Sequence, residues 1–180
     1  MGCDIHTYVE VKEGGRWVGN DEEVFEVPDI ARWDYRKDYY PTKHSVHPDL
    51  GRNYSLFGWL AGVRNYSAVV PLSAPRGVPD DLSGTVSDEA FRWEGDGHTH
   101  SYFTAAELLA VDYEQTVEDR RHTVQEASGI FNGGATCAPG KGVKEKLGDF
   151  IGRDFITVVK KMATLHHDPK CVRLVFWFDN

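Results

Sequence analysis

The sequence is poor in cysteine and contains no long apolar run. Its 180 residues include three cysteines, Cys3, Cys137 and Cys171. This number is small and odd, which argues against a disulfide framework. No stretch approaches the roughly 20 apolar residues of a transmembrane helix, and no signal-peptide pattern opens the sequence. We therefore expect a cytoplasmic protein with no membrane partner.

Basic residues are scarce relative to acidic ones. The formal net charge is −8, whereas proteins that wrap long DNA or RNA carry a basic footprint. We therefore expect no long nucleic acid as a partner. A small anionic ligand stays open, because it needs only two or three local Arg or Lys side chains.

Several common catalytic motifs are missing. There is no Gly-x-Ser-x-Gly elbow, no Gly-x-Gly-x-x-Gly fingerprint, no Cys-x-x-Cys and no EF-hand loop. The Gly140-Lys141-Gly142 segment does not have the spacing of a P-loop. Nothing in these patterns favours a serine hydrolase or a standard nucleotide-binding loop.

Two regions read as strands. Alternation over residues 4–12 predicts a strand, and a turn at 13–16 leads into a second strand at 16–18, which together make a hairpin. The nearly apolar run 171–178, interrupted by Arg173, predicts an interior strand.

Three regions read as helices. Residues 53–64 are expected to form a helix with Asn53 or Ser55 as its N-cap. A capping box at residues 104–107 predicts a helix that runs to about residue 126. Residues 144–166 have the clearest helical spacing of apolar residues. We expect loops at 20–50, 71–84 and 131–142.

These elements predict an α+β or α/β fold in a single compact domain spanning residues 1–180. Its central sheet would include the N-terminal hairpin and the C-terminal strand, with about three helices packed on it and long loops. Hydrophobic residues make up 41% of the chain, which is ample for such a core.

Two short polar clusters, far apart in sequence, carry the strongest chemical signal. Each holds ligand-type side chains at positions i and i+2, which share one face of an extended backbone about 6–7 Å apart. Their members are Asp4 and His6 in the first cluster, and Asp96, His98 and His100 in the second. If they meet, they could hold a divalent metal ion such as Zn or Mn, or perform acid–base catalysis. The alternative is a surface histidine and a glycine-rich loop whose histidines only form hydrogen bonds.

A second set of residues fits anion recognition. Arg52, Arg64 and Arg76 lie 12 residues apart, and the planar guanidinium matches phosphate. The alternative is ordinary surface ion pairing. The expected ligand-binding set joins these arginines to neighbouring polar and aromatic groups: Arg52, Asn53, Arg64, Asn65, Arg76, Tyr102 and Thr104.

Separated blocks of the sequence resemble an uncharacterised family of small proteins encoded by bacteriophages and some bacteria. The most specific block is the opening Met-Gly-Cys-Asp-Ile-His, and others are residues 52–57, 60–65, 75–80, 98–104 and 176–180. The resemblance implies a context and no particular reaction. Small phage proteins often act against host defence, some by cleaving or sequestering nucleotide signals in the host cytosol.

We therefore expect a small phage-type hydrolase, dependent on a metal or on histidine, that acts on a phosphate-containing small molecule such as a nucleotide. Asp4, His6, His98 and His100 would be catalytic, and Asp179 joins them if the C-terminal strand lies beside the N-terminal one. The alternatives are a non-catalytic protein that sequesters a nucleotide, for which a homo-oligomer would be expected, and an interaction protein with no small-molecule site.

Overall fold

The computed structural model describes residues 2–27, 43–123 and 136–180. Its main sheet has the strand order β2-β1-β8-β5. These strands are Arg16–Gly19, Asp4–Glu13, Val172–Asp179 and His98–Thr104, respectively. Every pairing in this sheet is antiparallel, so the fold is α+β and not α/β.

The predicted N-terminal hairpin is confirmed. Lys12 pairs with Trp17 and Glu13 with Arg16 across the turn. Gly14 and Gly15 have φ angles of 54° and 84°, the left-handed values that a tight hairpin turn requires. The turn composition therefore sets the register of β1 on β2.

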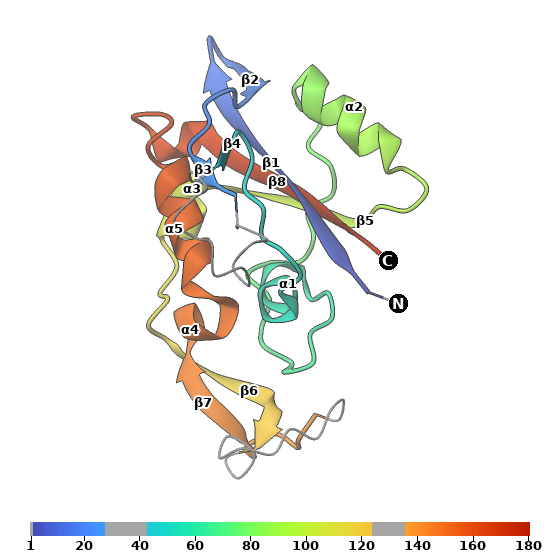
Figure 1. The fold of residues 1–180 in the computed structure, drawn as a ribbon, viewed down its shortest axis with the longest axis vertical. Helices are drawn as coiled ribbons and strands as arrows, with labels where there is room; N and C mark the ends of the chain where they lie inside the picture. The colour runs from blue at the N-terminus through green and yellow to red at the C-terminus, as the bar shows by residue number, and fades with distance from the viewer. Residues whose placement is uncertain (1, 28–42, 124–135) are drawn as a thin grey trace.

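The predicted interior strand is also confirmed, as β8. It lies between β1 and β5, and its residues from Val172 to Phe178 are buried. Asp4 lies directly opposite Asp179, so the beginning of β1 and the end of β8 are neighbours (Figure 1). The C-terminal strand therefore lies beside the N-terminal strand, which was the condition for including Asp179.

The two faces of the sheet are covered unequally. One face packs its apolar side chains against α1 (Tyr54–Ala61), α3 (Ala105–Leu109), α4 (Leu147–Ile151) and α5 (Arg153–Met162). The other face is covered by α2 (Gly84–Arg92), whose one buried residue is Val86 (Figure 1). We call these the core face and the α2 face.

The expected helix at 53–64 forms as α1. The Asn53 side chain accepts a hydrogen bond from the Leu56 backbone N–H, and Gly62 ends the helix with φ 75°. Asn53 is therefore the cap, as one of the two alternatives proposed.

The capping box at Thr104 and Glu107 is present, but the helix that it starts ends at Leu109. The expected extension to about residue 126 is wrong. The chain turns at Asp112 and enters β6 (Thr116–Thr123), which pairs with β7 (Gly142–Lys146). Backbone pairing with a distant segment therefore replaced helical hydrogen bonds after Leu109.

The expected helix at 144–166 is also wrong in extent. Its beginning lies in β7, and Gly152, with φ 90°, separates α4 from α5. The apolar period itself holds, because Ile151, Phe155 and Met162 are all buried in the core.

The long loop expected at 20–50 contains one small pairing, β3 (Phe25–Glu26) with β4 (His44–Ser45), and residues 28–42 lie outside the described ranges. The segment from residue 71 to α2 has no helix or strand, as expected for a loop. Helix α2 itself was not predicted from the sequence. A short 3-10 turn, η4 (Pro169–Cys171), precedes β8. The glycine-rich loop expected at 131–142 is described from residue 136 onward.

In the described parts of the chain, no helix has the length and apolarity to cross a membrane.

A buried ion pair ties the sheet to α2. Arg173 of β8 donates to the carboxylate of Glu10 on β1 at 2.6 Å, and both side chains are buried. The other oxygen of Glu10 accepts from the backbone N–H of Ser83, the N-cap of α2. Arg173 also holds the side chain and carbonyl of Asp81. The pair therefore fixes β1, β8 and the entry of α2 together.

Removing one partner of this pair should be severe. In Arg173→Met, Glu10 stays buried without its counter-ion, so we expect the free energy of unfolding in urea to fall by about 3–5 kcal/mol. A double variant, Glu10→Leu with Arg173→Met, should recover more than half of that loss. Arg92→Met, which breaks the exposed pair with Glu89, is the matched control and should change stability by less than about 1 kcal/mol. An unchanged stability in Arg173→Met would contradict this account.

His47 protects the exposed edge of β1 beyond the end of β2. Its Nδ1 accepts a hydrogen bond from the Val9 N–H at 3.1 Å, which requires the neutral ring at that nitrogen. Burial lowers the pKa of His47 below the ordinary value of 6.5. The folded state therefore favours neutral His47 more than the unfolded state does.

His47 should stabilise the fold fully above about pH 6.5, the pKa of a histidine in the unfolded chain. This stabilisation should be lost as the pH falls through the lower pKa that His47 has in the folded state. We expect the urea midpoint to drop between pH 7 and pH 5 by more in the native protein than in His47→Gln, which has no titrating ring. The exposed His44→Gln is the control and should keep the native pH dependence. Parallel pH profiles for the native protein and His47→Gln would refute the role of His47.

Candidate functional site

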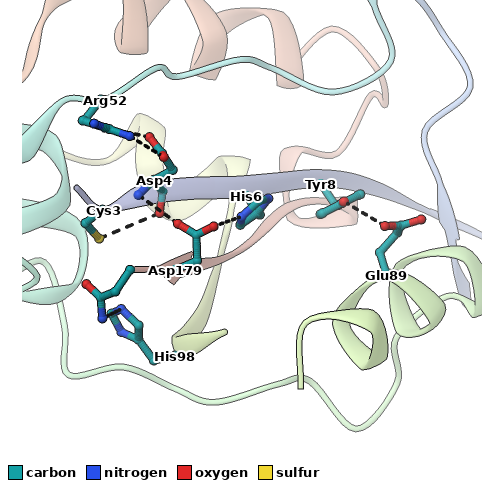
Figure 2. A network of polar contacts seen from close by, with 9 residues as sticks. Cys3, Asp4, His6, Tyr8, Arg52, Glu89, His98 and Asp179 are labelled. Carbon is teal, nitrogen blue, oxygen red and sulfur yellow. Dashed lines mark hydrogen bonds and ion pairs between the residues drawn. The ribbon is translucent and has the colours of Figure 1, made fainter. Parts of the chain in front are cut away.

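Several polar side chains gather where the start of β1, the end of β8 and the start of β5 meet. We call this the strand corner, and Figure 2 shows it in close view. Its members come from distant parts of the sequence: Cys3, Asp4, His6, Arg52, Arg64, His98, Asp179 and Asn180. The fold therefore places the first predicted cluster and part of the second at one corner of the sheet.

His6 and Asp179 form a dyad. The Nε2 atom of His6 lies 3.2 Å from Oδ2 of Asp179, and both side chains are about one-fifth exposed, at 22% and 20%. The other oxygen of Asp179 accepts the backbone N–H of Asp4 at 3.1 Å, which fixes the carboxylate. Since the carboxylate holds Nε2–H, Nδ1 is the nitrogen left to accept a proton. Trp93 packs on the His6 ring at 4.0 Å between centroids.

Arg52 pairs with Asp4 in a bidentate manner. Its Nε and NH2 atoms donate to the two carboxylate oxygens at 2.8 and 2.6 Å. These hydrogen bonds hold the pKa of Asp4 below its ordinary value. Because Asp4 lies directly opposite Asp179, two like charges face each other across the strands, and Arg52 and His6 offset that repulsion. Both side chains of the Arg52–Asp4 pair are about half exposed, so a ligand could exchange for Asp4.

A second chain of hydrogen bonds fixes His98. Arg64 donates to Oδ1 of Asn180 at 3.2 Å, so the amide nitrogen of Asn180 faces Nε2 of His98 at 3.1 Å. Nδ1 of His98 lies 2.8 Å from the Thr99 hydroxyl. This network assigns the proton of His98 to Nδ1, because Nε2 must accept from the amide.

Backbone strain coincides with this chain. Arg64 and Thr99 have φ angles of 51° and 55°, which non-glycine residues rarely adopt and which are especially unfavourable for β-branched Thr. The register of β5 on β8 shifts between His98 and Ser101. Strain of this kind clusters at functional sites.

His100 lies on the α2 face, next to Trp177. Its ring is nearly parallel to the Trp177 indole at 5.6 Å, and the His6 ring is similarly placed at 5.9 Å. Burial, with a smaller effect from nearby His98, lowers the pKa of His100. His6 and His100 therefore lie beside the same indole, whereas the His98 ring lies beside Phe178 of the core face.

The proposed metal ligands do not converge. Within residues 2–27, 43–123 and 136–180, no group of at least three His, Cys, Asp or Glu side chains is arranged to hold a metal ion. Asp96 is exposed in the turn after α2, whereas His98 is held by Asn180. The residues Asp4, His6, Asp96, His98 and His100 are thus not gathered into one such group.

The predicted ligand-binding residues separate into three groups. Four have their polar atoms engaged by the fold: Asn53 as cap of α1, Asn65 in a turn with Val69, Thr104 in the capping box, and Arg76 paired with Glu107. Tyr102 packs near Arg173 on the α2 face. Arg52 and Arg64 are the two that reach the strand corner.

Three contributors were not anticipated: Asn180, Trp93 and Trp177. A signal for Trp177 was present, because alternate residues of the C-terminal strand share one face with Asp179. Asn180 and Trp93 carry no comparable signal, since their contacts depend on segments far away in sequence.

Comparison with protein-family models, with curated proteins and with solved structures finds no match.

Cys3 is fully buried beside the dyad, and burial raises the pKa of its thiol, with Arg64 offsetting part of the rise. A buried, protonated thiol is a poor nucleophile. We expect Cys3 in the native protein to react with a disulfide reagent at pH 8 about ten-fold more slowly than Cys137 or Cys171, both partly exposed. Concentrated urea should make the three rates equal, and Cys3→Ser identifies the slow phase. A fast Cys3 in the folded protein would show that the corner is open.

Proposed function

We propose that this chain is a histidine-dependent hydrolase of a phosphate-containing small molecule, for example a nucleotide signal in a host cytosol. The observation that supports it is the His6–Asp179 dyad, in which a carboxylate fixed by a backbone N–H orients a partly exposed imidazole. A base oriented by a carboxylate is the usual arrangement for activating water. Arg52 and Arg64 lie at the same corner, and a planar guanidinium group can bind phosphate through two hydrogen bonds.

In the proposed reaction, Nδ1 of His6 takes a proton from water as the water oxygen bonds to phosphorus. The bond from phosphorus to the leaving oxygen breaks, and that oxygen takes the proton back from the His6 imidazolium. Asp179 stabilises the imidazolium while it exists. His100, kept neutral by its lowered pKa, donates a hydrogen bond to a phosphoryl oxygen. Arg52 binds the phosphate in exchange for Asp4.

Two other forms of the proposal have less support. A metal-dependent form with Zn or Mn requires converging ligands, and the described residues contain no such group. A sequestering protein would use the same arginines and aromatic rings but gives no reason for a carboxylate-oriented histidine. In the experiment below, each form would give a distinct result.

The test is turnover of a nucleotide panel by the purified full chain, read by chromatography. Asp179→Asn keeps the size of the side chain but removes the charge that stabilises the imidazolium, so we expect kcat to fall about 10²- to 10⁴-fold. Asp88→Asn, an exposed carboxylate on α2, is the matched control and should keep the native rate.

Product formation that stops in Asp179→Asn supports the proposal. Intact nucleotide released on denaturation, with no product, would replace it with the sequestering function. Equal rates in the native protein and Asp179→Asn would remove the dyad from the reaction. A rate restored by Zn or Mn after chelation would favour the metal-dependent form.

A further inference from the structure

The loop at residues 64–69, which follows α1, keeps a strained backbone. Arg64 and Ala68 have φ angles of 51° and 52°, which residues with a side chain rarely adopt. The side chain of Asn65 bridges the loop, because its Oδ1 accepts the N–H of Val69 and its Nδ2 donates to the Val69 carbonyl. Strained conformations persist only where the surrounding contacts enforce them, and they cluster at functional sites.

Two neighbouring elements hold this loop in place. Helix α1 approaches it so closely that a Cβ at Gly58 would lie 3.0 Å from Cα of Asn65. On the β6 side, the Ser67 hydroxyl donates to the buried carboxylate of Asp119 at 2.8 Å and accepts the N–H of Arg120. The loop is therefore pre-organised, which lowers the entropic cost of binding a ligand to the side chains that it exposes.

Tyr66 is the aromatic side chain that this loop presents to solvent, with 44% of its surface exposed. Its ring packs against that of Tyr54 at 6.1 Å between centroids, with 65° between the ring planes. The Tyr54 hydroxyl in turn accepts the N–H of Cys3 at the strand corner. The Tyr66 ring is thus held from one side, while much of its surface stays open to a ligand.

A guanidinium group adjoins this open ring. Arg64 forms side-chain hydrogen bonds with Tyr66 and Cys3. It also donates to Oδ1 of Asn180 at 3.2 Å. Cys3 directly precedes Asp4, so the aromatic ring and the positive charge meet beside the strand corner. An aromatic surface next to a cation matches a ligand that joins a planar ring to a phosphate.

We propose that the ligand of the strand corner is a nucleoside phosphate whose base stacks on Tyr66 while Arg64 binds its phosphate. This inference rests on the proposed function and narrows its substrate class to phosphates that carry an aromatic base. Stacking uses only the face of the base, so it tolerates different bases. A sugar phosphate leaves the Tyr66 ring uncovered and should bind more weakly.

The test compares two probes, adenosine monophosphate and the matching ribose phosphate, which lacks the base. Binding is measured by calorimetry with the full chain carrying Asp179→Asn, so that turnover does not consume the nucleotide. We expect the nucleotide to bind at least about 10-fold more tightly than the ribose phosphate. The ratio of the two affinities is the readout, because a change at Arg64 affects both probes alike.

Adding Tyr66→Leu should bring this ratio close to one, whereas Tyr66→Phe, which keeps the ring, should preserve it. Phe91→Leu, which removes an exposed aromatic ring from α2, is the matched control and should also preserve the ratio. Should Tyr66→Leu not fold, adenosine monophosphate should still move the ring-proton NMR signals of Tyr66 upfield in the Asp179→Asn chain, and the ribose phosphate should not.

A ratio near one before any change at Tyr66, or one that survives Tyr66→Leu, would overturn the inference. So would a ratio lost in Phe91→Leu, which would place the base on α2, or the absence of saturable binding of either probe. A native chain that turns over no nucleotide contradicts the proposed catalysis, yet a ratio that depends on Tyr66 would still support base binding. Turnover that depends on Asp179, together with a ratio near one, overturns this inference alone.

Discussion

The buried pair of Glu10 and Arg173 is the constraint on which the remaining geometry depends. It joins two neighbouring strands on the α2 face and, through Ser83, holds the first turn of α2. A shift of one residue between β1 and β8 would send one of these charges to the apolar core face, which would be prohibitively costly. The pair therefore fixes the register that sets Asp4 against Asp179 and His6 against Trp177. The candidate site is a consequence of that register.

The unequal covering of the sheet explains where polar chemistry is tolerated. The core face is packed by apolar side chains from α1, α3, α4 and α5. The α2 face is closed by one helix with a single buried residue, so polar side chains of β1 remain partly accessible there. Two opposed carboxylates persist at its end because Arg52 and His6 lie beside them. The partly exposed polar side chains of β1 and β8 thus lie on the thinly covered side.

Local patterns predicted the parts of the fold that local chemistry determines. Alternation located β1, an apolar run located β8, and Thr104 with Glu107 marked the start of α3. The helix ends were wrong because pairing of β6 with β7 and the positive φ of Gly152 depend on tertiary structure. The site divides in the same way: Asp4, His6 and the conditional Asp179 could be proposed from one strand pattern. The Arg64–Asn180–His98 chain could not, because its three segments are adjacent only after folding.

The hydrogen bonds of the three histidines assign them different roles. Both ring nitrogens of His98 are engaged, by Asn180 and by Thr99, so it cannot transfer a proton without breaking a contact of the strained β5 segment. His6 has one nitrogen held by a carboxylate, which leaves the other to accept a proton. His100 is half-buried, and burial lowers its pKa, so in the proposed reaction its neutral ring would donate a hydrogen bond. In the proposed reaction, His6 is therefore the histidine available for proton transfer, whereas His98 holds the C-terminal end of β8 through Asn180.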